Sequence, residues 1–194
     1  MFECKAKTLF ALKKRIFDLL LLLICLSVFI VPIIFIYISI RITSGNNVIY
    51  WSDRIGKDNI IFKMPKFRTM KTNTPSVATH LLKKPESWIT PVGKILRKFS
   101  LDELPQLWSI FKGEMSFVGP RPALFNQNDL IKLRTKNSVH QILPGITGLA
   151  QINGRDELSI SDKVSFDIEY LKKGSLVLDI KIILITIRKI FSPS

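Results

Sequence analysis

The chain has 194 residues, a length that suits one domain of ordinary size with a short appendage. The formal net charge is +14. Six of the 29 Lys and Arg residues lie within residues 1–45, and the other 23 are spread along the rest of the chain. This spread positive charge suits anionic lipid, nucleic acid or phosphorylated ligands equally. Two cysteines without a scaffold pattern and two isolated histidines exclude a disulfide framework and a zinc site, so we expect a reducing compartment and no disulfide.

An apolar run at residues 19–40 contains no charge and is long enough for a helix to cross a bilayer. The run is too long for the apolar part of a signal peptide, and no small-x-small cleavage site follows it. Pro32 removes a backbone donor near the middle and favours a kink or a break. Basic residues flank both ends, so the positive-inside rule gives no direction. A helix that breaks at Pro32, dips into one leaflet and returns satisfies both observations. A single transmembrane span is the alternative that the sequence leaves open.

A turn cluster at 44–47 ends this apolar segment and marks the boundary between two predicted units, residues 1–45 and residues 46–194. Two short runs of β-branched and aromatic residues follow, at 48–51 and 60–64. Their composition and the polar connection between them predict a small β-hairpin at the start of the second unit.

Most of the remaining chain is predicted to be helical. After a long surface loop at 71–91, we expect a short basic amphipathic helix at 92–99 and then a central helix that ends at Gly113. The central helix carries an apolar stripe, expected to be buried, that consists of Leu101, Leu104, Leu107, Trp108 and Phe111. Further helices are expected at 123–142, 159–172 and 176–189. The last of these is basic and amphipathic, which suits the plane of the lipid headgroups and a protein core equally. The predicted fold class is α+β and mostly helical.

Two adjacent carboxylates, Asp102 and Glu103, stand at the start of the central helix. With Ser100 they form an S-x-x-E capping box, in which Glu103 bonds back to the Ser100 amide, and spacing alone favours this structural interpretation. Pro105 weakens it, because a proline at the fifth helical position leaves the helix without one donor; the helix can instead begin near Pro105, with both acids in the preceding turn. An ionised aspartate there can attack phosphorus, and the neighbouring glutamate can hold a divalent cation.

Several basic residues offer partners for a phosphate. Arg121 lies between Pro120 and Pro122, which restrict the backbone on both sides, and its guanidinium matches phosphate oxygens in a bidentate way. Without the two acids, a solvated arginine on a rigid surface turn would be the favoured interpretation of Arg121. Three further cations also look like ordinary surface residues when taken singly: Lys66, Arg68 and Arg97. Together with a metal ion, such a set would neutralise a diphosphate, which is much of what phosphoryl transfer requires.

The chain resembles the bacterial sugar transferase family, the monotopic polyprenyl-phosphate phosphoglycosyl transferases, over nearly its whole length. The matching segments are KRIFD (14–18), KFRTM (66–70), SLDELPQLW (100–108), KGEMSFVGPRP (112–122), PGITGLAQINGR (144–155) and the pair Asp167 and Tyr170. The resemblance implies that Asp102 is a nucleophile that carries a phospho-sugar intermediate, and that Glu103 binds Mg²⁺. It also implies that four residues bind the phosphates or the nucleotide: Lys66, Arg97, Arg121 and Asp167. We add Arg68 to this set because of its positive charge.

The activity implied by this resemblance is transfer of a sugar 1-phosphate from a UDP-sugar to undecaprenyl phosphate, a polyprenyl phosphate, with release of UMP, to begin a cell-surface glycan. The resemblance also implies a re-entrant membrane helix broken at Pro32, interfacial amphipathic helices, and a catalytic domain (46–194) on the cytoplasmic face of the bacterial inner membrane. The expected partners are the two substrates and membrane lipids but not nucleic acid, and a homodimer is left open. The alternative from another class is a non-enzymatic, membrane-tethered module that binds polyanions through its basic surface.

Overall fold

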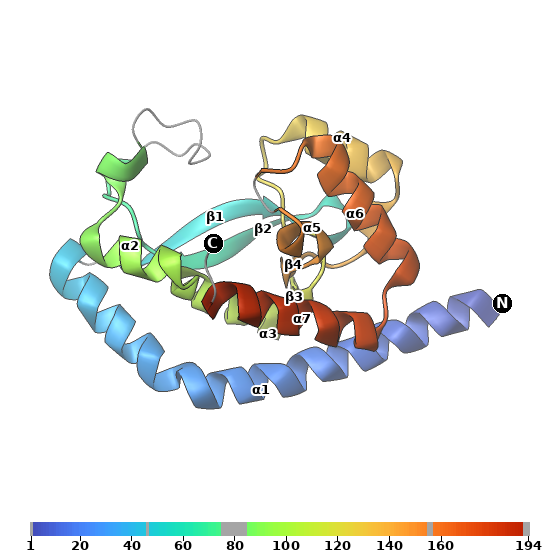
Figure 1. The fold of residues 1–194 in the computed structure, drawn as a ribbon, viewed down its shortest axis with the longest axis horizontal. Helices are drawn as coiled ribbons and strands as arrows, with labels where there is room; N and C mark the ends of the chain where they lie inside the picture. Colours follow the sequence, from blue (N-terminus) through green and yellow to red (C-terminus); the bar gives the residue numbers. More distant parts are fainter. Residues whose placement is uncertain (1, 46, 75–84, 155–156, 192–194) are drawn as a thin grey trace.

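The computed structural model describes residues 2–45, 47–74, 85–154 and 157–191, and within them the chain is mostly helical with two small sheets of two strands each (Figure 1). The α-helices are α1 (Phe2–Ser44), α2 (Pro91–Lys98), α3 (Leu107–Lys112), α4 (Asn128–Lys136), α5 (Leu149–Ile152), α6 (Ile160–Lys173) and α7 (Leu176–Phe191). Short 3₁₀ helices are η1 (Lys57–Asn59), η3 (Pro85–Trp88), η4 (Leu101–Gln106) and η5 (Val139–Gln141). The predicted mostly helical α+β class is confirmed.

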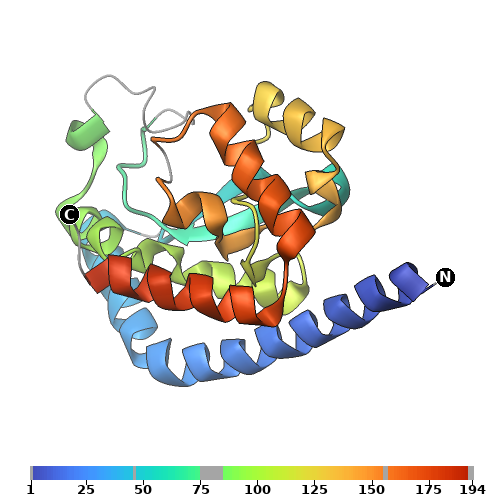
Figure 2. The ribbon, with the colours of Figure 1, turned by 45° about the vertical axis from the view of Figure 1, so that its right-hand side comes forward.

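Helix α1 stays helical through Pro32, so the predicted break at this residue is wrong. The helix bends instead: Figures 1 and 2 show its N-terminal half running beside α7 and its last part rising beside α2. Loss of one backbone donor inside a long helix bends it without ending it when the surrounding turns keep their hydrogen bonds. Residues Leu9–Ser44 are long and apolar enough to cross a membrane by length and composition, and most of this segment is exposed.

The predicted hairpin is confirmed, with strands longer than the sequence indicated. Strand β1 (Ile49–Ile55) pairs with β2 (Ile61–Phe67) in antiparallel register, with Ile49 opposite Phe67. Phe62 and Met64 on β2 are buried in the main core. Because side chains alternate along a strand, Lys66 lies on the same face as these two apolar residues, and its side chain points toward the interior.

A second sheet joins β3 (Ser116–Val118) and β4 (Gly145–Thr147) in parallel, and the sequence did not predict it. Strands of three residues are too short to display a periodic pattern, so they look like loops in the sequence. A side chain at Gly145 would place a Cβ 2.1 Å from the backbone nitrogen of Gly119, so this close approach requires a glycine. The pairing fixes where the Gly119–Pro122 segment starts.

The helices predicted at 92–99, 159–172 and 176–189 are confirmed as α2, α6 and α7. The helix predicted at 123–142 is wrong in extent, since α4 covers Asn128–Lys136 and η5 follows it. The amide of Leu124 is bonded to the Gln127 side chain at 2.9 Å, which holds the preceding residues in a turn. Of the loop predicted at 71–91, residues 75–84 lie outside the described part of the chain.

The apolar stripe of the central helix is buried in part only. Leu107 is buried and Leu101 and Leu104 are half-buried, but Trp108 is 51% exposed and Phe111 is 59% exposed, with their rings stacked 5.6 Å apart. The prediction failed because Leu101–Gln106 is a 3₁₀ helix with three residues per turn, so the α-helical spacing does not run through it. Two large aromatic side chains are thus left on the surface of α3.

Helix α7 likewise presents an apolar surface. Ile182 and Asp179 are completely buried, whereas Ile180, Leu184 and Ile187 are exposed. Because these three apolar side chains are exposed, a plain core helix does not describe α7.

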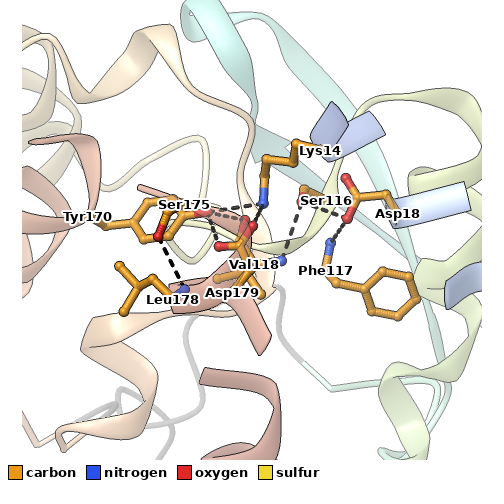
Figure 3. A network of polar contacts seen from close by, with 9 residues as sticks. All are labelled: Lys14, Asp18, Ser116, Phe117, Val118, Tyr170, Ser175, Leu178 and Asp179. Carbon is orange, nitrogen blue, oxygen red and sulfur yellow. Dashed lines mark hydrogen bonds and ion pairs between the residues drawn. The ribbon is translucent and has the colours of Figure 1, made fainter. Parts of the chain in front are cut away.

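Three charged residues of α1 bond the helix to the rest of the molecule, and Figure 3 shows two of them, Lys14 and Asp18. The Lys14 ammonium lies 2.6 Å from Asp179 of α7 and 3.0 Å from the hydroxyl of Tyr170 of α6. Tyr170 in turn donates to Asp179 at 2.6 Å. Because Asp179 is fully buried, this cation and hydroxyl are what make its charge tolerable.

The other two attachment residues, Asp18 and Arg15, hold β3 and α3. Asp18 is 1% exposed and accepts from the Ser116 hydroxyl at 3.0 Å and the Phe117 amide at 3.1 Å (Figure 3). The guanidinium of Arg15 donates to the carbonyls of Ile110 and Phe111 at the C-terminal end of α3, where a cation is favourable. We call Lys14, Arg15 and Asp18 the docking residues of α1.

We expect Lys14→Met to lower the free energy of unfolding by about 3 kcal/mol, because it leaves the buried Asp179 without its cation. Lys13→Met is the matched control, since Lys13 is an exposed lysine of the same helix. Thermal or denaturant unfolding in detergent micelles measures both. Equal stability of the two variants would contradict a structural role for this ion pair.

Candidate active site

The two adjacent carboxylates lie in η4, the 3₁₀ helix before α3. Ser100 has φ 54°, in the left-handed region, and its side chain makes no capping bond, so the capping-box prediction is wrong. The alternative, with both acids in a turn that precedes the α-helix, is confirmed: Pro105 lies inside η4 and α3 begins at Leu107. The capping box fails because the Glu103 carboxylate is bonded elsewhere.

Glu103 lies between two cations that come from distant parts of the chain. Its Oε1 atom accepts from the Lys66 ammonium at 2.7 Å and from the Arg121 guanidinium at 3.0 Å. Lys66 comes from the end of β2, and Arg121 comes from the segment after β3. The side chain of Glu103 is 8% exposed, whereas that of Arg121 is 29% exposed, so the arginine keeps a face open to solvent.

Electrostatics keep Glu103 ionised. Burial by itself would raise the pKa of this carboxyl, but Arg121 and Lys66 outweigh burial and hold the pKa of Glu103 well below its ordinary value. A carboxylate that stays charged in a buried place is suited to bind a cation or to orient cationic groups.

Asp102 experiences a different balance in the same turn. Burial raises its pKa above the ordinary value, and the neighbouring charge of Glu103 adds to this, while Lys66 and Arg97 oppose it. Arg97 is held in place by a bond from its Nε to the Thr69 hydroxyl at 2.9 Å. Asp102 is thus a half-buried carboxylate that is not bonded to two cations as Glu103 is. A carboxylate in this condition is suited to act as a nucleophile.

Helix α2 brings Arg97 to this site by packing closely on residue 69. A Cβ at Gly93 would lie 2.2 Å from the Thr69 carbonyl oxygen, so only glycine permits the approach. Thr90 caps the helix by accepting from the Gly93 amide at 3.0 Å.

Two predicted site residues have other surroundings. Arg68 donates to the Asn47 carbonyl at 2.7 Å and lies over the Tyr50 ring, so its contacts are with the hairpin. Asp167 is buried and accepts from Arg134 of α4 at 2.9 Å and 2.7 Å. Arg134 was not predicted, because a single arginine in a polar helix has the appearance of a surface residue. Arg155, the last residue of the matching segment 144–155, lies outside the described residues.

The donors available to a metal ion are the carboxylates of Asp102 and Glu103. Among the described residues, no group of three or more His, Cys, Asp and Glu side chains could enclose a metal. Mg²⁺ commonly uses one or two carboxylates and takes its other ligands from substrate phosphates and water, and an ionised Glu103 next to Asp102 fits that donor set.

We expect Ser100→Ala to change the free energy of unfolding by less than about 0.5 kcal/mol, because Ser100 caps nothing. Ser159→Ala should cost about 1 kcal/mol, since the Ser159 side chain accepts from the Asp162 amide at the start of α6. Denaturant unfolding of the two variants side by side tests this difference. A loss at Ser100 as large as that at Ser159 would restore the capping box.

Comparison with known proteins identifies the family. A family model described as "Bacterial sugar transferase" matches residues 9–193. The sugar transferase EpsL of Bacillus subtilis is 40% identical over 91% of this chain and 86% of its own length. The exopolysaccharide production protein ExoY of Rhizobium meliloti is 38% identical over 90% of the chain and 83% of its length. The UDP-glucose:undecaprenyl-phosphate glucose-1-phosphate transferase of Escherichia coli is 36% identical over 93% of the chain and 40% of its length. The chain is therefore an enzyme, a sugar-phosphate transferase, and belongs to the bacterial sugar transferase family.

Proposed function

We propose that this enzyme transfers a sugar 1-phosphate from a UDP-sugar to undecaprenyl phosphate, releases UMP, and so begins a cell-surface glycan. The observation that carries the proposal is the placement of Asp102 beside an ionised Glu103 that two cations hold. The names of the relatives support the donor and the lipid acceptor, since the Escherichia coli protein is named for UDP-glucose and undecaprenyl phosphate. Family membership sets aside the non-enzymatic polyanion-binding alternative.

The reaction follows from the roles available to the side chains. A carboxylate oxygen of Asp102 attacks the phosphorus that bears the sugar, the bond from that phosphorus to the bridging oxygen breaks, and UMP leaves with the electron pair. The phosphate oxygen of undecaprenyl phosphate then attacks the same phosphorus, and the bond to Asp102 breaks. Each step exchanges one P–O bond for another, so no oxidant or reductant is needed.

The cations around the turn balance the charge that these steps develop. Arg121 keeps part of its guanidinium exposed and is suited to bind the diphosphate oxygens. Lys66 pairs with Glu103, and the charges of Lys66 and Arg97 act on Asp102, so both add positive charge to the site. Glu103, with Asp102, would hold Mg²⁺, which when bound supplies further neutralisation of the diphosphate. Burial raises the pKa of Asp102, whereas Arg121 and Lys66 hold the pKa of Glu103 below its ordinary value. The Asp102 carboxylate is therefore the stronger base of the two, so we assign attack to Asp102 and orientation of the cations to Glu103.

A membrane location is supported by apolar side chains on one side of the molecule. Helices α2, α3 and α7 all lie on the side of α1 in Figures 1 and 2. The exposed large apolar residues on these helices and at the C-cap of α2 are Ile95, Phe99, Trp108, Phe111, Val177, Ile180, Leu184, Ile187 and Phe191. Soluble proteins rarely expose apolar patches of this extent, and exposed basic residues on α2 and α7 suit anionic headgroups. We propose that these helices lie in the cytoplasmic interface of the inner membrane and that α1 re-enters it.

We expect Asp102→Asn to lower UMP release at least about 10³-fold and to abolish the covalent phospho-sugar intermediate while the protein still folds. The assay mixes the enzyme with Mg²⁺, undecaprenyl phosphate and each of a panel of UDP-sugars, and the intermediate is sought by intact-protein mass spectrometry. Asp53→Asn is the control, because Asp53 is an exposed aspartate of the hairpin. Full activity of Asp102→Asn would refute the nucleophile assignment.

We expect both ends of the chain to be protected from a membrane-impermeant maleimide in intact cells. The test uses a Cys25→Ser variant that keeps Cys4 and a second variant in which Ser194→Cys replaces Cys4 as the target. Both cysteines should react after the membrane is permeabilised. Reaction of Cys4 alone in intact cells would show an exported N-terminus and a single span.

A further inference from the structure

The segment Gly119–Ala123, which carries Arg121, is bonded at every backbone carbonyl. Five successive carbonyl oxygens accept hydrogen bonds from donors on four different elements. The donors, in chain order of the acceptors, are Gln151 Nε2 at 3.4 Å, Gly145 N at 2.9 Å, Arg134 Nη1 at 2.8 Å, Arg54 Nη1 at 3.2 Å and Ile55 N at 2.9 Å. A loop bonded from so many sides has little freedom to change its path.

Two of these donors are arginine side chains, and each has its own support. Arg134 binds Asp167 through Nε and Nη2, which leaves Nη1 to reach the Arg121 carbonyl. Arg54 donates from Nε to the hydroxyl of the buried Ser52 at 3.0 Å and from Nη1 to the Pro122 carbonyl. We call Arg54 and Arg134 the arginine clamp.

The clamp compensates for what the two prolines remove. Pro120 and Pro122 have no N–H, so this stretch of backbone can be held mainly through its carbonyls. Its path decides where the Arg121 guanidinium lies, and that guanidinium meets Glu103 at 3.0 Å. A misplacement of about 1 Å at a catalytic group can cost about 10²-fold in rate, so a fixed backbone here has direct value.

We infer that Arg134 and Arg54 are positioning residues, which set Arg121 for catalysis by clamping the carbonyls of Arg121 and Pro122, and that Asp167 acts through Arg134. This inference rests on the proposed function of Arg121. Arginine is required because its planar fork bonds two acceptors at once, whereas one ammonium of a lysine cannot span the Asp167 carboxylate and the Arg121 carbonyl in the same geometry.

The first test is Arg134→Lys, which keeps the charge that faces Asp167 and loses the fork. We expect the single-turnover rate of UMP release to fall about tenfold to a hundredfold, with the thermal midpoint close to that of the wild type. Lys132→Met is the matched control on the exposed side of α4 and should keep the wild-type rate. A wild-type rate in folded Arg134→Lys would overturn the inference.

A double-mutant cycle separates positioning from a general structural role. In an Arg121→Lys background the clamp has no guanidinium to position, so adding Arg134→Lys should lower the residual rate by less than about threefold. If the two losses multiply instead, Arg134 does not act through Arg121 and the inference fails. If Arg134→Lys does not fold, the same double-mutant cycle is measured with Arg54→Lys and Arg121→Lys.

Hydrogen exchange gives a readout that does not depend on the reaction. In the full chain in detergent micelles, Arg134→Lys and Arg54→Lys should each speed exchange at the amides of Gly119, Arg121, Ala123 and Leu124, while Lys132→Met should not. Unchanged protection in both clamp variants would overturn the clamp even if the rates fell. If the wild type released no UMP from any UDP-sugar, the proposed function would fail, and exchange alone would decide whether the clamp exists.

Discussion

Four carboxylates of the described chain are almost completely buried, and each accepts from at least one donor in a segment distant in sequence. Asp18 meets β3, Glu103 meets β2 and the segment after β3, Asp167 meets α4, and Asp179 meets α1 and α6. A buried charge is costly unless it is paired, so each carboxylate admits only arrangements that bring its partner to it. Apolar packing of Ile110, Met115, Val118 and Ile182 supplies the bulk of the core, but such contacts are not directional. The ionic contacts therefore select which elements meet at the active site.

The sequence predicted the elements that have a long period and failed where an element is short. Helices α2, α6 and α7 and the hairpin show their patterns over several turns or pairs. The β3–β4 sheet and η4 have three to six residues each, which is too few for a period to appear. The basic residues before the apolar run have the pattern of a membrane flank, yet Lys14 and Arg15 are bonded inside the protein. A charge on a helix carries no mark in the sequence that tells a lipid neighbour from a buried carboxylate.

The acidic and basic side chains that meet in the candidate site could be predicted from the sequence, whereas the residues that support them could not. The segments that match the family contain four of the site residues: Asp102, Glu103, Lys66 and Arg121. The resemblance therefore predicted all four as residues of one site. Arg54 and Arg134 donate to backbone carbonyls. Every residue has such a carbonyl, so the sequence does not indicate which one an arginine will bind. The capping box shows the converse, because a perfect local pattern lost to two distant cations once the chain folded.

Through its docking residues, α1 is connected to η4, which carries Asp102, by a short and stiff segment of the chain. Arg15 holds the carbonyls of Ile110 and Phe111, and the chain from Asp102 to Ile110 runs through η4 and the first turn of α3. At about 1.5–2 Å per residue, this route spans about 15 Å. Because we propose that α1 is embedded in the membrane, Asp102 is held at a fixed height close to the headgroups, where the phosphate of a polyprenyl lipid lies. The lipid phosphate could then reach the proposed intermediate on Asp102 while its chain stays in the bilayer, and a flexible link between α1 and α3 would lose that alignment.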